Sequence, residues 1–343
     1  MTLLSAFCRP CNLVAVSLIS LAVPYLSGQQ PEAVPPSYVL TLGTTRALAV
    51  PNFGFAGSPQ CDTRENAYFG IASASYVTHS VMRVPSDGQS ETRFPPPKEF
   101  ETDNLHFSVS PDGDVYELAS STLVGFSNSG DELNRTVLQL PDGFLVASFA
   151  VQSNARIAVQ GIIPIPLPKP YKPGDIPEAT PVTLFLDRLG KPILRNDGSQ
   201  VSLSDGLQGK IASGKTGTFL QLHDTTLSVL DLDGHLENSY NLPRPRKDSK
   251  PMSLQYIDGQ IAVEFAYVDP KRGFSPDSKH PEIKVGPLIE EWAIMNAEDG
   301  TIKGFYSLPD DFVGSSLCYL GNHEFLNLSV KNKQTVFLNA TMP

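Results

Sequence analysis

The stretch TLVGFSNSG, residues 122–130, joins an apolar strand-like run to a polar turn that ends in glycine. The same pattern recurs along the chain as SVMRVPSDG (80–88), VTLFLDRLG (182–190), LSVLDLDG (227–234) and WAIMNAEDG (292–300), and QTVFLNATM (334–342) repeats its first half. Equivalent residues of successive copies are 42, 60, 44, 66 and 42 residues apart. The chain therefore consists of repeats of about 43 residues with insertions in two of them.

Each copy follows two more strand-like runs, so one repeat holds four strands, and its length is typical of a propeller blade. Six such units predict an all-β, six-bladed β-propeller of four-stranded antiparallel blades over residues 29–343, with insertions at about 161–181 and 268–287. The last unit lacks an outer strand, and the unassigned run Ser37–Leu42 is predicted to supply it and close the ring. Two sandwich domains are the alternative, but they do not predict a single period.

Turns of the SPDG type, as at 110–113, accompany this rhythm. In both respects the chain resembles the six-bladed propellers of the NHL-repeat and related bacterial secreted families over nearly all of residues 29–343. This resemblance implies an architecture and leaves the activity open.

Residues 1–28 have the layout of a secretory signal peptide: the single charge of Arg9, an apolar run, and small residues before Gln29. An uncleaved membrane anchor is the alternative, but the apolar run of about 14 residues is shorter than the roughly 20 that span a bilayer. We therefore predict a secreted or periplasmic protein that has no membrane span after cleavage.

The overall charge argues against nucleic-acid binding. The chain has a formal net charge of −10 with 41% hydrophobic and 18% charged residues, which indicates a globular, acidic protein. Residues 209–216 match the phosphate-loop pattern G-x-x-x-x-G-K-[ST], but a strand pattern follows where a nucleotide site needs a helix. We predict neither a nucleic-acid nor a nucleotide partner.

Blade topology predicts which face carries function. The glycine-ended turns join third to fourth strands on one face, whereas both insertions join second to third strands and rise from the opposite face. That face also gathers a basic group within an acidic protein: Arg244, Arg246, Lys247, Lys271 and Arg272. We predict an anion-binding site there, for a carboxylate-bearing glycan or a peptide C-terminus. The alternative is a solvated loop with a few ion pairs.

A metal site is the weaker candidate. Some six-bladed propellers are metal-dependent lactonases, and Ser204-Asp205-Gly206-Leu207 is similar to a motif that supplies one ligand in them. Their Glu-Gly-Pro motif is absent, because the first blade reads SPQCDTRENA, and Asp and Gly are also ordinary turn residues. His106 and His323 are predicted on inner strands, as polar residues of the channel.

Cys8 and Cys11 leave with the signal, so the exported chain keeps Cys61 and Cys318. The blade assignment places both on innermost strands of neighbouring blades, one and six, and an oxidising compartment favours a disulfide between them. Two buried thiols or an isolated metal site are the alternatives.

Together these features predict a monomeric binding scaffold without a cofactor, whose partner is a protein, a peptide or an anionic glycan held on the insertion-bearing face. The alternative is a metal-assisted lactonase or esterase-like hydrolase with Ca²⁺ at the central channel. Metal content distinguishes the two.

Overall fold

A computed structural model of the 343-residue chain describes residues 35–51, 54–72, 78–85, 91–96, 105–153, 156–165, 179–194, 202–204, 210–268, 275–276, 284–285, 288–309, 316–331 and 334–343. They belong to one compact unit, Pro35–Pro343. The predicted signal peptide, residues 1–28, lies outside the described residues.

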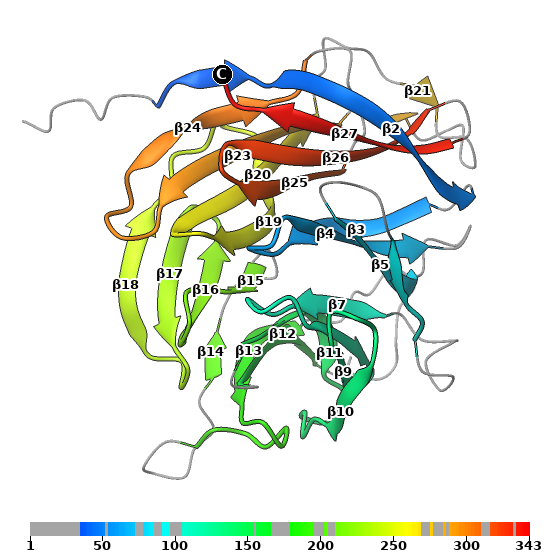
Figure 1. Ribbon diagram of the computed structural model, residues 1–343. Helices are drawn as coiled ribbons and strands as arrows, with labels where there is room; N and C mark the ends of the chain where they lie inside the picture. Colours follow the sequence, from blue (N-terminus) through cyan, green and yellow to red (C-terminus); the bar gives the residue numbers. More distant parts are fainter. Residues whose placement is uncertain are drawn as a thin grey trace, which may run out of the picture. The chain divides into compact units, whose positions relative to one another are not determined.

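The fold is a six-bladed β-propeller, as the repeats predict (Figure 1). In the described residues every regular element is a strand, and each blade runs outward from an innermost strand in chain order. Blade one consists of β3 (Gly54–Cys61), β4 (Asn66–Ala72), β5 (Thr78–Pro85) and β6 (Thr92–Phe94), and blade two of β7 (His106–Val109), β8 (Val115–Ala119), β9 (Thr122–Phe126) and β10 (Glu132–Val137). Blade three consists of β11 (Leu145–Val151), β12 (Ile157–Pro164), β13 (Ala179–Leu186) and β14 (Ser202–Ser204), and blade four of β15 (Lys210–Ser213), β16 (Thr218–His223), β17 (Thr226–Asp231) and β18 (Leu236–Asn241). Blade five consists of β19 (Lys250–Ile257), β20 (Gln260–Val268), β23 (Leu288–Asn296) and β24 (Ile302–Ser307), and blade six begins with β25 (Ser316–Gly321), β26 (Glu324–Lys331) and β27 (Gln334–Thr341). Within the described part of the chain, no helix is long and apolar enough to cross a membrane.

The N-terminal segment closes the ring. Strand β2 (Thr41–Pro51) pairs antiparallel with β27 and is the fourth strand of blade six, which confirms closure by the N-terminus. The preceding β1 (Ser37–Val39) instead pairs in parallel with β24 and becomes a fifth strand of blade five. Figure 1 shows the blue N-terminal strands along the orange β24 and the red β27. One segment thus joins two blades, where the sequence predicts a single strand in one.

Glycine turns lie where the repeat predicts them. The turns between third and fourth strands contain Gly130, Gly190, Gly234 and Gly300 with φ of 95°, 72°, 84° and 74°, a left-handed backbone that favours glycine. A Cβ on Gly234 would also lie 2.6 Å from the ring of Phe185 in the neighbouring blade. The first predicted insertion, about 161–181, overlaps paired strands at both ends, since β12 extends to Pro164 and β13 begins at Ala179. Within the second, about 268–287, β21 (Ser275–Pro276) and β22 (Lys284–Val285) form a short hairpin.

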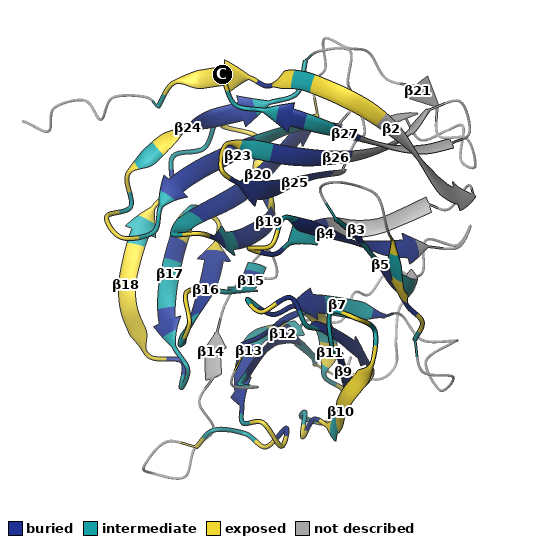
Figure 2. Cartoon of the chain, viewed as in Figure 1, coloured by how far each residue is buried: buried dark blue, intermediate teal, exposed yellow. Residues whose placement is uncertain are grey.

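The core consists of apolar layers between neighbouring blades. Side chains alternate along each strand, so Val115 and Ala119 of β8 pack toward blade one, whereas Tyr116 and Leu118 pack toward blade three. The outermost strands β10 and β18 are exposed along their length (Figure 2).

One carboxyl interrupts this apolar packing. Glu117 of β8 is fully buried, on the same face as Val115 and Ala119, and pairs in register with Phe107 and Val124. Neither of its carboxyl oxygens has a hydrogen-bond partner among the described residues. Burial therefore raises the pKa of Glu117 to about 8.

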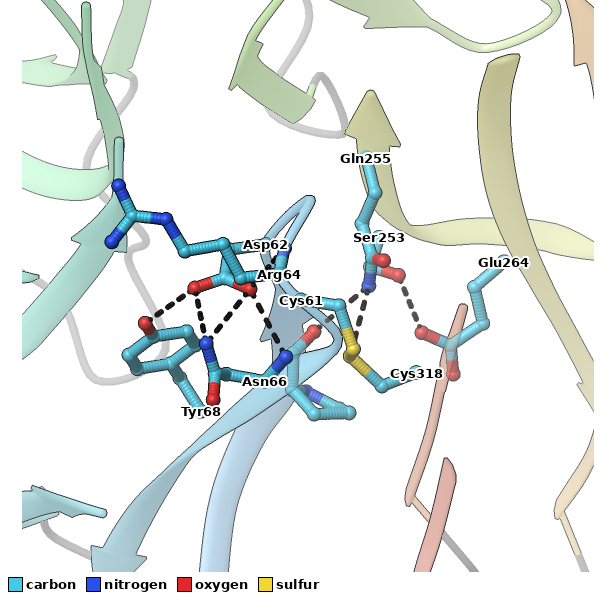
Figure 3. Close-up of a disulfide and its surroundings, with 10 residues drawn as sticks. Cys61, Asp62, Arg64, Asn66, Tyr68, Ser253, Gln255, Glu264 and Cys318 are labelled. Carbon is cyan, nitrogen blue, oxygen red and sulfur yellow. Dashed lines mark hydrogen bonds between the residues drawn. A yellow bond between two sulfur atoms is a disulfide. The ribbon is translucent and has the colours of Figure 1, made fainter. Parts of the chain in front are cut away.

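A polar network joins blades one and two at the turn after β3 (Figure 3). The buried Asp62 accepts hydrogen bonds from the backbone amides of Arg64 and Asn66, from the Asn66 side chain at 2.9 Å, and from the Tyr68 hydroxyl at 2.7 Å. The same hydroxyl lies 3.1 Å from the carbonyl oxygen of Gly113 in blade two. Burial and the Asp62 carboxylate raise the pKa of Tyr68, so the phenol stays protonated.

The substitution Tyr68→Phe is expected to lower the free energy of unfolding by about 1.5 kcal/mol, since it leaves an oxygen of a buried carboxylate without this donor. Urea denaturation measures the loss. The matched control is Tyr240→Phe. The hydroxyl of the half-buried Tyr240 bonds to an exposed turn, so water can take its place there when the hydroxyl is removed. Equal stability of the two variants would contradict a structural role for the Asp62 network.

Candidate functional site: the central channel

Three blades meet at a disulfide beside the channel. Cys61, at the end of β3, and Cys318, on β25, are bonded with their Cα atoms 6.0 Å apart, which confirms the predicted pair. Gln255 of blade five donates from Nε2 to the carbonyl oxygen of Pro59 at 3.0 Å and lies 3.9 Å from the Cys318 sulfur (Figure 3). Blades five, six and one are therefore fixed together at one point.

The channel contains a cavity of about 610 Å³. Its walls are the innermost strands of blades one to five, and no described residue of blade six lines it. The contact between Gln255 and Pro59 accounts for this, because it brings blade five directly to blade one. The cavity lies within the range of small-molecule sites, about 300–1,000 Å³.

Ionisable side chains gather in this cavity toward the insertion-bearing face. Lys210 and His106 begin the innermost strands β15 and β7, and Glu264 and Glu290 reach the cavity from β20 and β23. Glu264 accepts a hydrogen bond from the Ser253 hydroxyl at 2.7 Å. One oxygen of Glu290, Oε2, is buried without a hydrogen-bond partner in the described structure.

Their protonation follows from burial. Desolvation raises the pKa of the Glu290 carboxyl, and the neighbouring Glu264 raises it further. Burial lowers the pKa of the Lys210 ammonium, while Glu264 opposes this shift. Burial alone lowers the pKa of His106, so this imidazole is neutral at pH 7. The raised pKa keeps a proton on Glu290, beside the carboxyl of Glu264.

The predicted basic group is only partly visible. Arg244 pairs with Asp224 and also donates to the carbonyl oxygen of Lys247 at 3.2 Å. Arg246 lies 3.8 Å from a carboxylate oxygen of Glu291 and 4.2 Å above the ring of Tyr267. The side chain of Lys247 is exposed, and Lys271 and Arg272 lie outside the described residues. An anionic ligand would have to compete with these carboxylates, and the anion site stays a prediction.

The other predicted site residues have varied outcomes. Asp205 lies outside the described residues, and the described ones include no group of three or more His, Cys, Asp or Glu side chains suited to a metal. His106 lies on an inner strand as predicted. The predicted position of His323 on an inner strand was wrong. His323 lies in the exposed turn between β25 and β26, where the chain reverses direction at Asn322 and His323 and the φ of His323 is 66°. Strand β16 follows the phosphate-loop match, so that match lacks its helix.

Sequence reasoning missed Lys210, Glu264 and Glu290. The available signal was a charge inside an otherwise apolar strand, as in QIAVEFAYV (260–268) and LIEEWAIMN (288–296). Such a charge is rarely buried without a specific reason.

No protein-family model and no curated protein sequence matches this chain. Among solved structures, it is similar to a streptogramin B lyase, at 13% identity and a TM-score of 0.46 over 88% of this chain and 98% of that one. It is also similar to a calcium-binding regucalcin from Agrobacterium tumefaciens, at 11% identity and a TM-score of 0.48 over 90% of this chain and 97% of that one. A gluconolactonase from Xanthomonas campestris is similar at 12% identity and a TM-score of 0.45, over 90% of this chain and 95% of that one. At these identities the likeness concerns the propeller fold alone.

Proposed function

We propose that this protein is a binding scaffold that holds a small polar ligand in the mouth of its central channel, next to the insertions. The observation that supports this is the gathering of the buried Glu264 and the half-buried Lys210 and Glu290 around one cavity. Burying ionisable groups costs free energy that a fold recovers elsewhere, and such groups concentrate at functional sites.

The ligand meets this protein outside the cytoplasm in our proposal. The Cys61–Cys318 disulfide is compatible with an oxidising compartment, where such bonds persist. The predicted signal peptide accords with the same location.

A thermal-shift screen of small polar compounds tests the proposed function. We expect compounds that raise the Tm of the wild type by several degrees at saturation, because a ligand at 100 times its Kd stabilises by about 2.7 kcal/mol. Ala147→Trp, at an exposed position of the cavity wall, should abolish these shifts by filling the channel.

The matched control is Leu236→Trp on the exposed outer strand β18, which should respond as the wild type does. Shifts that persist in Ala147→Trp would place the ligand elsewhere. Mass spectrometry of the recovered compound distinguishes binding from hydrolysis: an altered compound would favour the hydrolase alternative.

A further inference from the structure

Four polar side chains form a row along one face of blade five, which we term the acceptor row: Ser253, Gln255, Glu264 and Glu290. In register, Gln255 lies opposite Ala262, Ser253 opposite Glu264, and Glu290 opposite Ala266. Alternate residues of β20 share a face, and directly opposed residues share it too, so all four point the same way. Successive levels of the row are about 7 Å apart.

The row lines the channel cavity and contains two buried oxygens that have no hydrogen-bond partner in the described residues. All four residues border the cavity, and Figure 3 shows Ser253, Gln255 and Glu264 on one side of the disulfide. Gln255 is 5% exposed, and its amide nitrogen is used by Pro59 while its Oε1 has no partner in the described residues. Oε2 of Glu290 is likewise unpartnered, and the Ser253 hydroxyl proton is used by Glu264. Both unsatisfied atoms are acceptors.

The charges of the cavity residues also favour a cationic ligand. Among the described cavity residues, the acidic groups of the row face one cation, Lys210. Asp62 also borders the cavity, but its carboxylate is already satisfied by Asn66 and Tyr68. With both glutamates ionised, the row and Lys210 would carry a net negative charge in a buried site. The free protein relieves this by keeping a proton on Glu290, and a bound cation would replace that proton.

We propose that the ligand of this channel is a linear aliphatic amine, bound through its primary ammonium groups along the acceptor row. This rests on the proposed small-molecule binding function. An ammonium offers three donors to the carboxylates and to Gln255, and supplies the charge that the row lacks. The acceptors lie on three adjacent strands at successive levels about 7 Å apart, which suits a chain with an ammonium at each end.

Two other ligand chemistries fit this site less well. A neutral polyol offers donors but carries no charge, so it cannot replace the proton on Glu290 or form charge-assisted hydrogen bonds with both carboxylates. A Ca²⁺ ion takes six to eight oxygen ligands, whereas the acceptor row offers two carboxylates, on neighbouring strands and two residues apart in register. Both become controls in the test.

Calorimetric titration of the full-length protein with 1,4-diaminobutane tests the proposal, with 1,4-butanediol and CaCl₂ as the comparison probes. We expect the diamine to bind, and the diol and Ca²⁺ to bind at least tenfold more weakly. Glu290→Gln should weaken diamine binding by about 10- to 100-fold, as for a hydrogen bond to a charged group. The matched control Glu117→Gln also changes a buried carboxyl but lies outside the cavity, and should bind as the wild type does.

The substitution Lys210→Met tests whether the ligand is a cation or an anion. It removes the competing cation, so diamine binding should tighten, whereas binding of an anion would weaken. Weaker diamine binding in Lys210→Met, or equal binding of the diol, would overturn the proposal. If the compound screen finds ligands that Ala147→Trp abolishes and the diamine does not bind, the amine proposal fails while the binding function stands. If no small molecule binds, both fail.

Discussion

The double substitution Cys61→Ala/Cys318→Ala is expected to lower the free energy of unfolding by about 4 kcal/mol. The bond joins residues 257 apart in sequence, so its loss releases a long loop in the unfolded chain and raises its conformational entropy. It also separates blade one from blade six at their innermost strands. Calorimetry should show a Tm lower by roughly 10 °C, given the size of the protein.

When the protein is made with residues 1–28 retained, this experiment uses a Cys8→Ala/Cys11→Ala background, which removes the two other cysteines of the sequence. In that background, the wild-type pair treated with a reducing agent should unfold at the same temperature as the double variant. A Tm that neither reduction nor substitution changes would contradict a stabilising role for the bond.

The second large effect is the dependence of stability on pH through Glu117. The pKa of Glu117 is about 8 in the folded protein against an ordinary value of about 4.5, so the folded state holds a proton that the unfolded chain releases. Stability therefore falls as pH rises from about 4.5 to 8, with a slope of about 1.4 kcal/mol per pH unit. Glu117→Gln removes this titration, and should gain about 3 kcal/mol over the wild type between pH 5 and pH 8.

Urea denaturation at several pH values measures this difference. Glu290 titrates in the same direction in both proteins, so the comparison of wild type and variant isolates Glu117. The control Glu132→Gln, on the exposed strand β10, should keep the wild-type slope. Parallel pH profiles for Glu117→Gln and the wild type would show that this carboxyl has a partner or access to water.

The features that the sequence predicts are periodic ones. Repeat spacing locates the blades, and the glycine of each turn locates its third and fourth strands, because both depend on residues close together in the chain. The pairing of Cys61 with Cys318 follows from blade order. The acceptor row was beyond prediction, because it depends on the register of three strands and on which face of blade five turns toward the channel. Sequence also did not indicate the partners of Arg244 and Arg246, which lie near each other in the chain but have separate carboxylate partners, Asp224 and Glu291.

Strand β2 has a consequence for the order of folding. Its partner β27 is the last strand of the chain, and Thr41 faces Thr341 across 300 residues. Strand β2 therefore stays unpaired until β27 has been synthesised, and its exposed edge is open to pairing with other chains in that interval. Contacts this distant in sequence also slow folding, because the loop must close before they form. For this protein, the time between synthesis and ring closure is the period of greatest risk of aggregation.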